Sequence, residues 1–347
     1  MPKNSFRLPA EWETQSGVLI TWPHRKTDWA PILKEIEPVY VQLAQAITRF
    51  QKLLIIALHE THLAHIKQLL KQSQVDLSII SFTCEETNDT WTRDYGPITL
   101  RDDSKIRIVD FAFNGWGNKF NALLDNGITS KLVEKKQLKI DEINTVDFVL
   151  EGGSIESDGC GTVLTTSDCL LTESRNPTYN KAEIETYLET TLNIKKVLWL
   201  DYGYLSGDDT DSHIDMLARL VGKNRIAYLK CEDKNDEHYQ ALQAMEAQLK
   251  TFTNCQDEPY ELIPLPFTKA IYDSENGRRL PASYANFLII NGAVLVPIYG
   301  DAADQTALNT LQSCLPEREI IGIDFSIAIK QSGSLHCLTM QLPEGML

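Results

Sequence analysis

The sequence has no cysteine pattern of the kind that builds a disulfide framework or a zinc finger. Its 347 residues include 7 cysteines, and no two of them form a CxxC pair. An odd number leaves at least one thiol unpaired, and disulfide frameworks belong to much shorter secreted chains. We therefore expect free thiols and a reducing, cytoplasmic location.

Long apolar runs are also missing. A membrane-spanning helix needs about 20 predominantly apolar residues, and a secretory signal needs an apolar segment near the N-terminus. No run approaches that length, and Met1–Ser5 opens the chain without such a segment. We expect neither a membrane partner nor a secreted protein.

Basic residues are in short supply. The chain has 33 Lys and Arg against 48 Asp and Glu, a formal net charge of -15. This balance argues against a nucleic-acid partner, which requires a basic surface. It suits a small cationic substrate, although acidity of this size also serves solubility alone.

The fingerprints of common cofactor sites are absent as well. No glycine-rich segment matches a P-loop or a dinucleotide-binding turn. The acidic run Asp208–Asp215 lacks the glycine at the sixth position of a calcium loop. No second histidine or cysteine stands near it at zinc-site spacing. We therefore expect no cofactor and no metal.

What the chain does contain is a regular alternation of apolar strands and helices, which predicts an α/β fold. Strand pairs followed by a helix recur, with no linker between them, so we expect one domain over residues 1–347. The expected strands are 17–22, 53–58, 75–82, 98–100, 106–111, 146–150, 154–156, 162–166, 196–200, 226–230, 260–263, 286–290, 293–297 and 320–325. The expected helices are 31–50, kinked or split at Pro38, 60–74, 126–134, 181–192, 238–252 and 301–314.

Two acidic residues follow predicted strands or turns. Asp94 lies in the turn Trp91–Pro97, where a carboxylate beside an aromatic ring makes a cation site. A surface ion pair between Arg93 and Asp94 explains the same residues equally well. Glu151 follows an apolar strand and precedes two glycines, at a strand end where α/β proteins place their sites. A solvated acid in a turn is the alternative there.

The densest polar cluster surrounds His213. If residues 209–215 are extended, Asp209, Asp211, His213 and Asp215 share one face. Neighbouring carboxylates raise the pKa of a histidine, so this arrangement predicts acid–base chemistry.

A single cysteine, Cys337, ends the Gly/Ser-rich turn that begins at Gln331. An isolated cysteine is more often a small buried residue than a nucleophile. The polar clusters around Asp94, Glu151 and His213 favour the nucleophile, because they provide groups that activate a thiol and hold a cation. Trp116, in the loop Asn114–Gly117, fits either a pocket wall or a packing plug.

Taken together, these motifs resemble the agmatine deiminase and bacterial (Porphyromonas-type) peptidylarginine deiminase family of guanidine-modifying enzymes. The resemblance runs almost end to end. It is carried by six segments in order: Trp91–Pro97, Asn114–Gly117, Glu151–Gly159, Asp208–Asp215, Pro281–Phe287 and Ser334–Thr339.

The resemblance implies a fivefold pseudo-symmetric α/β propeller, or pentein, of ββαβ modules around a central, metal-free pocket. It also implies hydrolysis of a guanidinium to a ureido group and ammonia. Cys337 would be the nucleophile and His213 the general acid and base. Asp94 and Asp215 would hold the guanidinium, and Glu151 would orient or charge-stabilise the histidine.

The remaining substrate contacts are expected from residues around that centre. Trp91 would cover the flat or alkyl part of the substrate, and we also count Trp116, Asp209 and Arg93 among the substrate-binding side chains. The chain has Gln331-Ser-Gly-Ser-Leu-His-Cys337 where the family often has Gly-Gly-Gly-Asn-Ile-His-Cys, and Ser212 where it often has glycine. These departures keep the catalytic groups but affect the surroundings of the substrate tail.

Agmatine, converted to N-carbamoylputrescine through a covalent cysteine thiouronium, is the leading expected substrate. Peptidyl arginine and free arginine are alternatives with the same chemistry. A non-catalytic guanidine- or polyamine-binding protein would need neither Cys337 nor His213. A metal-dependent amidinohydrolase would need metal-ligand spacing that the chain lacks. A homo-oligomer stays open at this stage.

Overall fold

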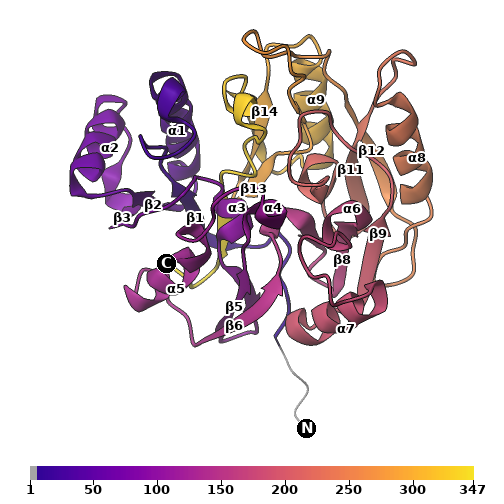
Figure 1. Ribbon diagram of the computed structural model, residues 1–347, viewed down its shortest axis with the longest axis horizontal. Coiled ribbons are helices and arrows are strands. Elements are labelled where there is room, and N and C mark those ends of the chain that lie inside the picture. Colours follow the sequence, from indigo (N-terminus) through magenta and orange to yellow (C-terminus); the bar gives the residue numbers. More distant parts are fainter. Residues whose placement is uncertain (1–5) are drawn as a thin grey trace.

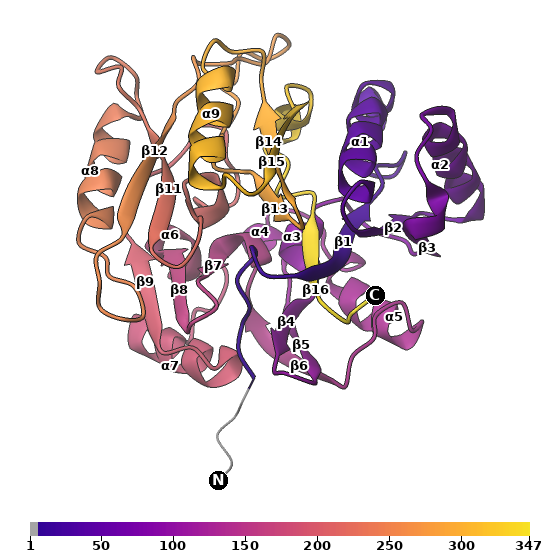
Figure 2. The same ribbon diagram turned by 180° about the vertical axis from the view of Figure 1, so that it is seen from behind.

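The strands of residues 6–347, the part of the chain that the computed structural model describes, form five small sheets (Figures 1 and 2). Four sheets have three strands each: β4 (Ile98–Arg101), β5 (Ile106–Ala112) and β6 (Glu142–Val149); β7 (Ile155–Ser157), β8 (Thr162–Thr166) and β9 (Lys196–Leu200); β10 (Ala218–Leu220), β11 (Arg225–Lys230) and β12 (Glu261–Pro266); β13 (Leu288–Ile290), β14 (Ala293–Ile298) and β15 (Glu319–Asp324). In each, the first pair is antiparallel and the second pair is parallel.

The fifth sheet joins the two ends of the described chain. Its order is β16 (Met340–Pro343), β1 (Gln15–Thr21), β2 (Lys52–Ala57) and β3 (Ile80–Cys84). β16 pairs antiparallel with β1, and β1 pairs parallel with β2, so the same sequence of pairings recurs. Figure 2 shows β16 lying beside β1. The segment that carries Cys337 is therefore held next to the N-terminal strand.

A helix connects the parallel strands of every sheet, as a parallel crossover requires. These crossover helices are α1 (Leu33–Thr48), α2 (Glu60–Gln72), α5 (Ile128–Glu134), α7 (Lys181–Leu192), α8 (Tyr239–Leu249) and α9 (Asp304–Cys314), of which α2 joins β2 to the parallel strand β3. The remaining α-helices of the described residues are the single turns α3 (Thr92–Tyr95), α4 (Gly115–Asn118) and α6 (Ser167–Leu170). The predicted α/β class is confirmed.

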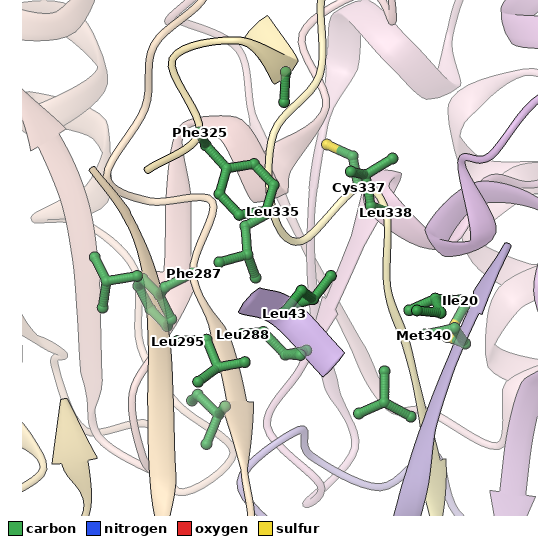
Figure 3. Packing of buried hydrophobic residues seen from close by; sticks show 14 of the residues in the cluster. Ile20, Leu43, Phe287, Leu288, Leu295, Phe325, Leu335, Cys337, Leu338 and Met340 are labelled. Atoms are coloured by element: carbon green, nitrogen blue, oxygen red, sulfur yellow. The ribbon is translucent and has the colours of Figure 1, made fainter. Parts of the chain in front are cut away.

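The apolar core anchors the segment around Cys337. Middle strands such as β2 and β14 are buried along nearly their whole length, which explains their continuous apolar sequences. Leu335 and Leu338, on either side of Cys337, are fully buried. Figure 3 shows them beside Cys337, with Phe325 next to Leu335. Two buried leucines thus fix the position of the thiol.

Several predicted elements need correction. Pro38 neither splits nor ends α1, because it lies in the second turn and removes only the hydrogen bond to Lys34, while Ile36 and Tyr40 are fully buried. The strand expected over 75–82 begins only at Ile80, because residues 77–79 form a 3₁₀ turn that Asp76 caps. The strand expected to start at 146 begins at 142.

The short strands β10 and β16 were not expected from the sequence, in which 320–325 was the last strand. Three or four residues are too few for a periodic pattern, and pairing with a longer neighbour defines each of them. The interpretation of Met1–Ser5 lies outside the described residues. Among residues 6–347, none of the helices combines the length and apolar composition that crossing a bilayer requires.

Candidate active site

Four of the predicted site residues line one cavity with Cys337. The cavity has an empty volume of about 460 Å³, and its walls include Trp91, Asp94, Trp116 and Asp209. These residues come from segments more than 200 positions apart in the sequence. The structure therefore brings together residues of four sequence motifs: Trp91–Pro97, Asn114–Gly117, Asp208–Asp215 and Ser334–Thr339.

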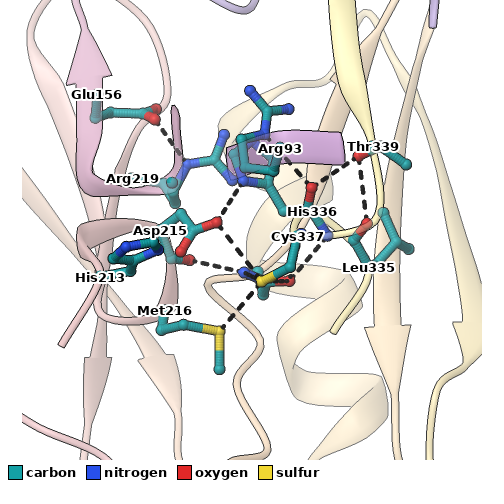
Figure 4. A network of polar contacts seen from close by, with 12 residues as sticks. Arg93, Glu156, His213, Asp215, Met216, Arg219, Leu335, His336, Cys337 and Thr339 are labelled. Carbon is teal, nitrogen blue, oxygen red and sulfur yellow. Dashed lines mark hydrogen bonds and ion pairs between the residues drawn. The ribbon is translucent and has the colours of Figure 1, made fainter. Parts of the chain in front are cut away.

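Cys337 lies 5 % exposed in a polar setting. Its Sγ is 3.3 Å from Asn286 Nδ2, 3.8 Å from Asp215 Oδ2 and 4.0 Å from Met216 Sδ (Figure 4). Burial, and then the negative charges of Asp215 and Asp94, raise the pKa of the thiol well above its ordinary value. In the absence of a bound cation the sulfur is a thiol.

His213 is fully buried, and its backbone differs from the expected one. Asp211 and Ser212 have φ values of 65° and 64°, so residues 209–215 are not extended and do not share one face. Asp211 instead forms ion pairs with Lys119 and Arg175. Because the backbone of Asp211 and Ser212 is left-handed, the Asp211 carboxylate pairs with these two basic groups, and His213 faces a different carboxylate.

That carboxylate belongs to Asp94, whose Oδ1 is 3.6 Å from His213 Nδ1. Burial opposes a charge on the imidazole, but Asp94, Cys169 and Glu151 outweigh it and raise the pKa of His213 well above its ordinary value. The pKa of His213 is raised, as predicted, but the main cause is the charge of Asp94 rather than that of Asp211. Neither ring nitrogen has a hydrogen-bond partner within residues 6–347.

Asp94 is oriented by two donors. Its Oδ1 accepts a hydrogen bond from the Gly153 amide at 3.0 Å, and its Oδ2 accepts one from Trp116 Nε1 at 2.9 Å. Burial raises the pKa of this carboxyl to about 6, against the lowering effect of His213. Both its charge and its orientation are therefore set by the surrounding structure.

Gly153 marks the point where three reactive groups converge. A Cβ at this position would lie 2.7 Å from both Asp94 Oδ1 and His213 Nδ1, and 3.2 Å from Asp215 Oδ2. Any side chain would displace them. The glycine after Glu151 is therefore needed for close approach, which is the physical reason for this part of the motif.

Asp215 begins a buried chain of charges behind Cys337 (Figure 4). His336 bonds Asp215 Oδ2 through Nδ1 at 2.7 Å and Glu11 Oε2 through Nε2 at 2.6 Å. Arg219 then bridges Glu11 and Glu156 at 2.9 and 3.0 Å. Burial disfavours the charge on Asp215, but the hydrogen bond and charge of His336 prevail and lower its pKa. Asp215 is thus held as a carboxylate.

Glu151 is fully buried behind His213. Arg175 Nε donates to both of its carboxylate oxygens, at 2.9 and 3.0 Å. The Glu151 carboxylate, Cys169 Sγ and a His213 ring nitrogen lie within 4.8 Å of one another. This donor set has the chemistry of a soft-metal site. Arg175, however, already supplies a positive charge to Glu151 and would compete with a metal cation.

The tryptophans form the cavity wall. Trp91 packs against Trp29 with ring centroids 5.5 Å apart and ring planes tilted by 44°, and it lies so close to Gly333 that a Cβ there would overlap its ring. Trp116 has a positive φ of 55°, which aims its indole at Asp94. Asp209 lines the same cavity, and burial together with Asp208 raises its pKa to about 6.

Arg93 does not belong to this wall. Its guanidinium lies in a separate cavity, where it contacts Gln341 Oε1 at 2.5 Å and Glu11 Oε2 at 3.5 Å. It is 3 % exposed, so the expected alternative of a surface pair with Asp94 also fails. Adjacent residues of the single turn α3 point to opposite sides, and only Asp94 faces Cys337.

Sequence reasoning missed several residues of the site. His336 and Asn286 were within motifs that carried the resemblance, and the position of His336 beside Cys337 was a usable signal. Glu11, Arg175 and Arg219 gave none. Each is a charged residue in an unremarkable segment, and only the tertiary structure buries it against its partner.

Comparisons with known proteins identify relatives along nearly the whole chain. The family model for Porphyromonas-type peptidyl-arginine deiminase matches residues 7–343. A protein of Enterococcus faecalis named as a putative agmatine deiminase is 32 % identical, over 99 % of this chain and 97 % of its own. A similarly named protein of Vibrio parahaemolyticus is 34 % identical, over 98 % of each.

Solved structures show the same likeness. A cysteine-to-serine variant of C. jejuni agmatine deiminase with substrate bound has a TM-score of 0.91 and 41 % identity, covering 99 % of this chain and 97 % of the other. The agmatine deiminase of Enterococcus faecalis has a TM-score of 0.87 and 32 % identity, covering 98 % and 96 %. The full-length family match and these relatives show that the chain belongs to the Porphyromonas-type peptidyl-arginine deiminase family.

Proposed function

We propose that this protein is an agmatine deiminase, a hydrolase that converts agmatine to N-carbamoylputrescine and ammonia. The observation that carries the proposal is the convergence of Asp94, His213 and Asp215 on Gly153, beside the thiol of Cys337. The names of the relatives from Enterococcus faecalis and C. jejuni support it.

The two carboxylates provide a seat for a guanidinium. A guanidinium is planar and cationic, and its N–H groups match the oxygens of carboxylates. Asp94 and Asp215 face the same point from different segments, so they can hold different nitrogens of one group. The guanidinium carbon then lies near Cys337 Sγ, which is 3.8 Å from Asp215 Oδ2.

Substrate binding would activate the thiol. Asp215 and Asp94 are among the causes that raise the pKa of Cys337, and a cation between them neutralises that effect. The charged His213 acts in the same direction. The nucleophile is therefore a thiolate mainly in the substrate complex, which limits its reaction with other electrophiles.

The reaction then proceeds in two halves. The Cys337 thiolate attacks the guanidinium carbon, and a C–S bond forms in a tetrahedral adduct. His213 gives its proton to the departing nitrogen, the C–N bond breaks, and ammonia leaves a thiouronium. His213, now neutral, takes a proton from water, whose oxygen attacks the same carbon. As the C–S bond of this second adduct breaks, its hydroxyl gives up the remaining proton to solvent, and the neutral ureido product and the thiolate are released.

The cavity walls favour agmatine over the other substrates considered. In addition to Asp94, the cavity is lined by Asp28, Asp89 and Asp209, and no lysine or arginine of residues 6–347 lines it. These acids suit the distal ammonium of agmatine. Free arginine would bring its carboxylate towards them at a Coulombic cost.

We further propose that the five sheets are the blades of a fivefold pseudo-symmetric α/β propeller and that residues 1–347 form a single catalytic domain. The recurring order of an antiparallel pair, a helix and a parallel strand supports this architecture. One apolar core cluster extends from Val18 to Met346, which supports a single domain. The free cysteines of the described residues support a cytoplasmic location.

The test is release of ammonia and ureido product from agmatine, free arginine and an arginine peptide, measured in parallel with a chelator present. We expect turnover of agmatine that Cys337→Ala abolishes. Cys84→Ala, which changes a half-buried thiol at the end of β3 and outside the cavity, is the matched control. Binding of agmatine without turnover by the unmodified protein would instead indicate a non-catalytic binding protein.

A further inference from the structure

We propose that Asp158, Cys160 and Cys255 form a binding site for a soft transition-metal ion such as Zn²⁺, separate from the cavity at Cys337. The Asp158 carboxylate and the two Sγ atoms lie within 4.8 Å of one another. Thiolates and carboxylates are ordinary zinc ligands. The site does not depend on the proposed reaction.

Two of the ligands come from a rigid turn. Asp158 and Cys160 lie in the connection between β7 and β8, where Asp158 Oδ1 accepts hydrogen bonds from the amides of Cys160 at 2.7 Å and Thr162 at 2.9 Å. Gly159 and Gly161 have positive φ values, which allow the tight turn. This network fixes the carboxylate and leaves its second oxygen, Oδ2, for another partner.

That second oxygen is buried without a partner. Asp158 is 2 % exposed, and its Oδ2 has no hydrogen-bond donor within the described part of the chain. The nearby hydroxyls of Thr162 and Tyr260 are in the same condition. A buried carboxylate oxygen left unpaired costs free energy, so its position calls for a cation or another donor. A metal ion bound to Oδ2 would meet that need.

The third ligand comes from a second docked loop. Cys255 lies between α8 and β12, and Figure 2 shows this loop beside β9. The side chain of Asn254 accepts hydrogen bonds from the amides of Gln256 and Glu258, and Lys196 of β9 donates to the Thr253 carbonyl at 3.0 Å. The loop is therefore held in place, while the Cys255 side chain is exposed and free to move.

The local charges leave room for a cation. Burial, together with Cys160 and Asp158, raises the pKa of the Cys255 thiol. Two basic groups near the cluster have other partners, since Arg7 pairs with Glu13 at 2.6 Å and Lys196 bonds the backbone of Thr253, while the Lys195 side chain packs beside Gly161. A divalent ion would replace the protons of the Cys160 and Cys255 thiols. Its positive charge would then offset the negative charges of the two thiolates and the Asp158 carboxylate.

The geometry needs only a small adjustment. Ligand atoms around a tetrahedral zinc ion are about 3.3–3.8 Å apart, given metal–ligand distances of about 2.0–2.3 Å. The donor atoms, which lie within 4.8 Å of one another, must therefore approach by up to about 1.5 Å, and a rotation of the exposed Cys255 side chain can supply much of this movement. Water completes the coordination. The ion would join the β7–β8 turn to the α8–β12 loop, and so connect two neighbouring sheets.

The experiment uses the full chain carrying Cys337→Ala, so that the active-site thiol cannot bind metal. The protein is reduced with a phosphine, stripped with a chelator and titrated with Co²⁺, whose thiolate charge-transfer absorption reports sulfur ligation. We expect one equivalent to bind, Zn²⁺ to displace it, and the absorption to disappear in Cys160→Ser and Cys255→Ser. Cys84→Ser is the matched control, because Cys84 pairs with the Glu60 carboxylate at 3.4 Å in a thiol–acid contact outside both clusters.

Three results would overturn the proposal. The first is no thiolate absorption at any Co²⁺ concentration. The second is absorption that survives Cys255→Ser but disappears in Cys169→Ser, which places the metal beside His213. The third is a disulfide between Cys160 and Cys255 in the purified protein, with no metal uptake after its reduction. A rise in the thermal unfolding temperature with Zn²⁺ that is lost in Cys255→Ser is a second, independent support.

Discussion

Asp215 accepts a hydrogen bond of 2.7 Å from His336, and this contact gives Asp215 and Asp94, the two carboxylates proposed to hold the guanidinium, different pKa values. The charge and hydrogen bond of His336 outweigh burial and lower the pKa of Asp215. Asp94 lies 3.6 Å from His213, but there burial outweighs the charge of the histidine and raises the pKa of Asp94 to about 6. Asp215 therefore keeps its negative charge to lower pH than Asp94 does.

Removing His336 should damage both stability and substrate binding. His336→Ala leaves the Asp215 and Glu11 carboxylates buried without their shared donor, and we expect a loss of about 3 kcal/mol in the free energy of unfolding. KM for agmatine should rise about tenfold or more, since Asp215 loses its orientation. Urea unfolding and steady-state kinetics measure the two effects.

His238→Ala is the matched control for this prediction. His238 is as buried as His336 and bonds Asp236 at 2.7 Å, but it lies beside α8, away from the cavity. Asp236 keeps Arg279 as a partner, so the loss of stability should be smaller. KM should not change. An equal rise of KM in both variants would mean that His336 acts only through general stability.

A methyl group at Gly153 should disable the site without removing any reactive group. The new Cβ would lie 2.7 Å from Asp94 Oδ1 and His213 Nδ1, and Trp116 holds Asp94 in place. Displacement of about 1 Å typically costs about 100-fold in rate, so we expect kcat/KM of Gly153→Ala to fall by that factor. Gly127→Ala is the control, because its Cβ meets only the flexible Lys131 side chain at 3.6 Å.

The acid limb of kcat/KM should involve more than one proton. Asp94 and Asp209 have pKa values raised to about 6, and Asp89 of the same cavity has one raised to about 7, so each loses its negative charge as the pH falls below that value. Binding of a dication weakens as these charges are lost. The slope of the logarithm of kcat/KM for agmatine against pH should be smaller by about one in Asp209→Asn than in the unmodified protein. Equal slopes in both proteins would exclude Asp209 from substrate binding.

The sequence predicted the elements of the fold better than their connections in space. The long helices and the strand pairs before them follow from local periodicity, and α7 matches its predicted bounds 181–192, with a capping box at Asn180. β16 has only four residues, and its existence depends on pairing with β1. Such a strand has no local signal, so the joining of the chain ends could not be read from residue patterns.

In the candidate site, too, the residues with local sequence motifs were predicted and their tertiary contacts were not. Asp94, Glu151, His213, Asp215 and Cys337 were all identified from motifs. Their partners were not, because the charge of a buried group is balanced by whichever residue the tertiary structure brings near. The clearest failure was the extended conformation assumed for 209–215, which the positive φ values of Asp211 and Ser212 exclude. Backbone conformation of this kind is favoured at glycine, and serine at 212 concealed it.

The last prediction concerns Glu151, whose charge helps to raise the pKa of His213. Glu151→Gln removes that charge, so the pKa of His213 should fall. Because His213 must be protonated to release ammonia, the alkaline limb of kcat should move to lower pH. Glu156→Gln is the matched control, since Glu156 is also a buried glutamate paired with an arginine, Arg219 Nε at 3.0 Å, but is not among the main causes of the raised pKa of His213. Both variants should lose stability, because each leaves an arginine without its buried partner. Only Glu151→Gln should shift the alkaline limb, and an imidazole titration followed by NMR should show the same shift for His213. An unchanged limb in Glu151→Gln would mean that Asp94 alone sets the charge of His213, and that Glu151 serves to hold Arg175 rather than to tune the acid.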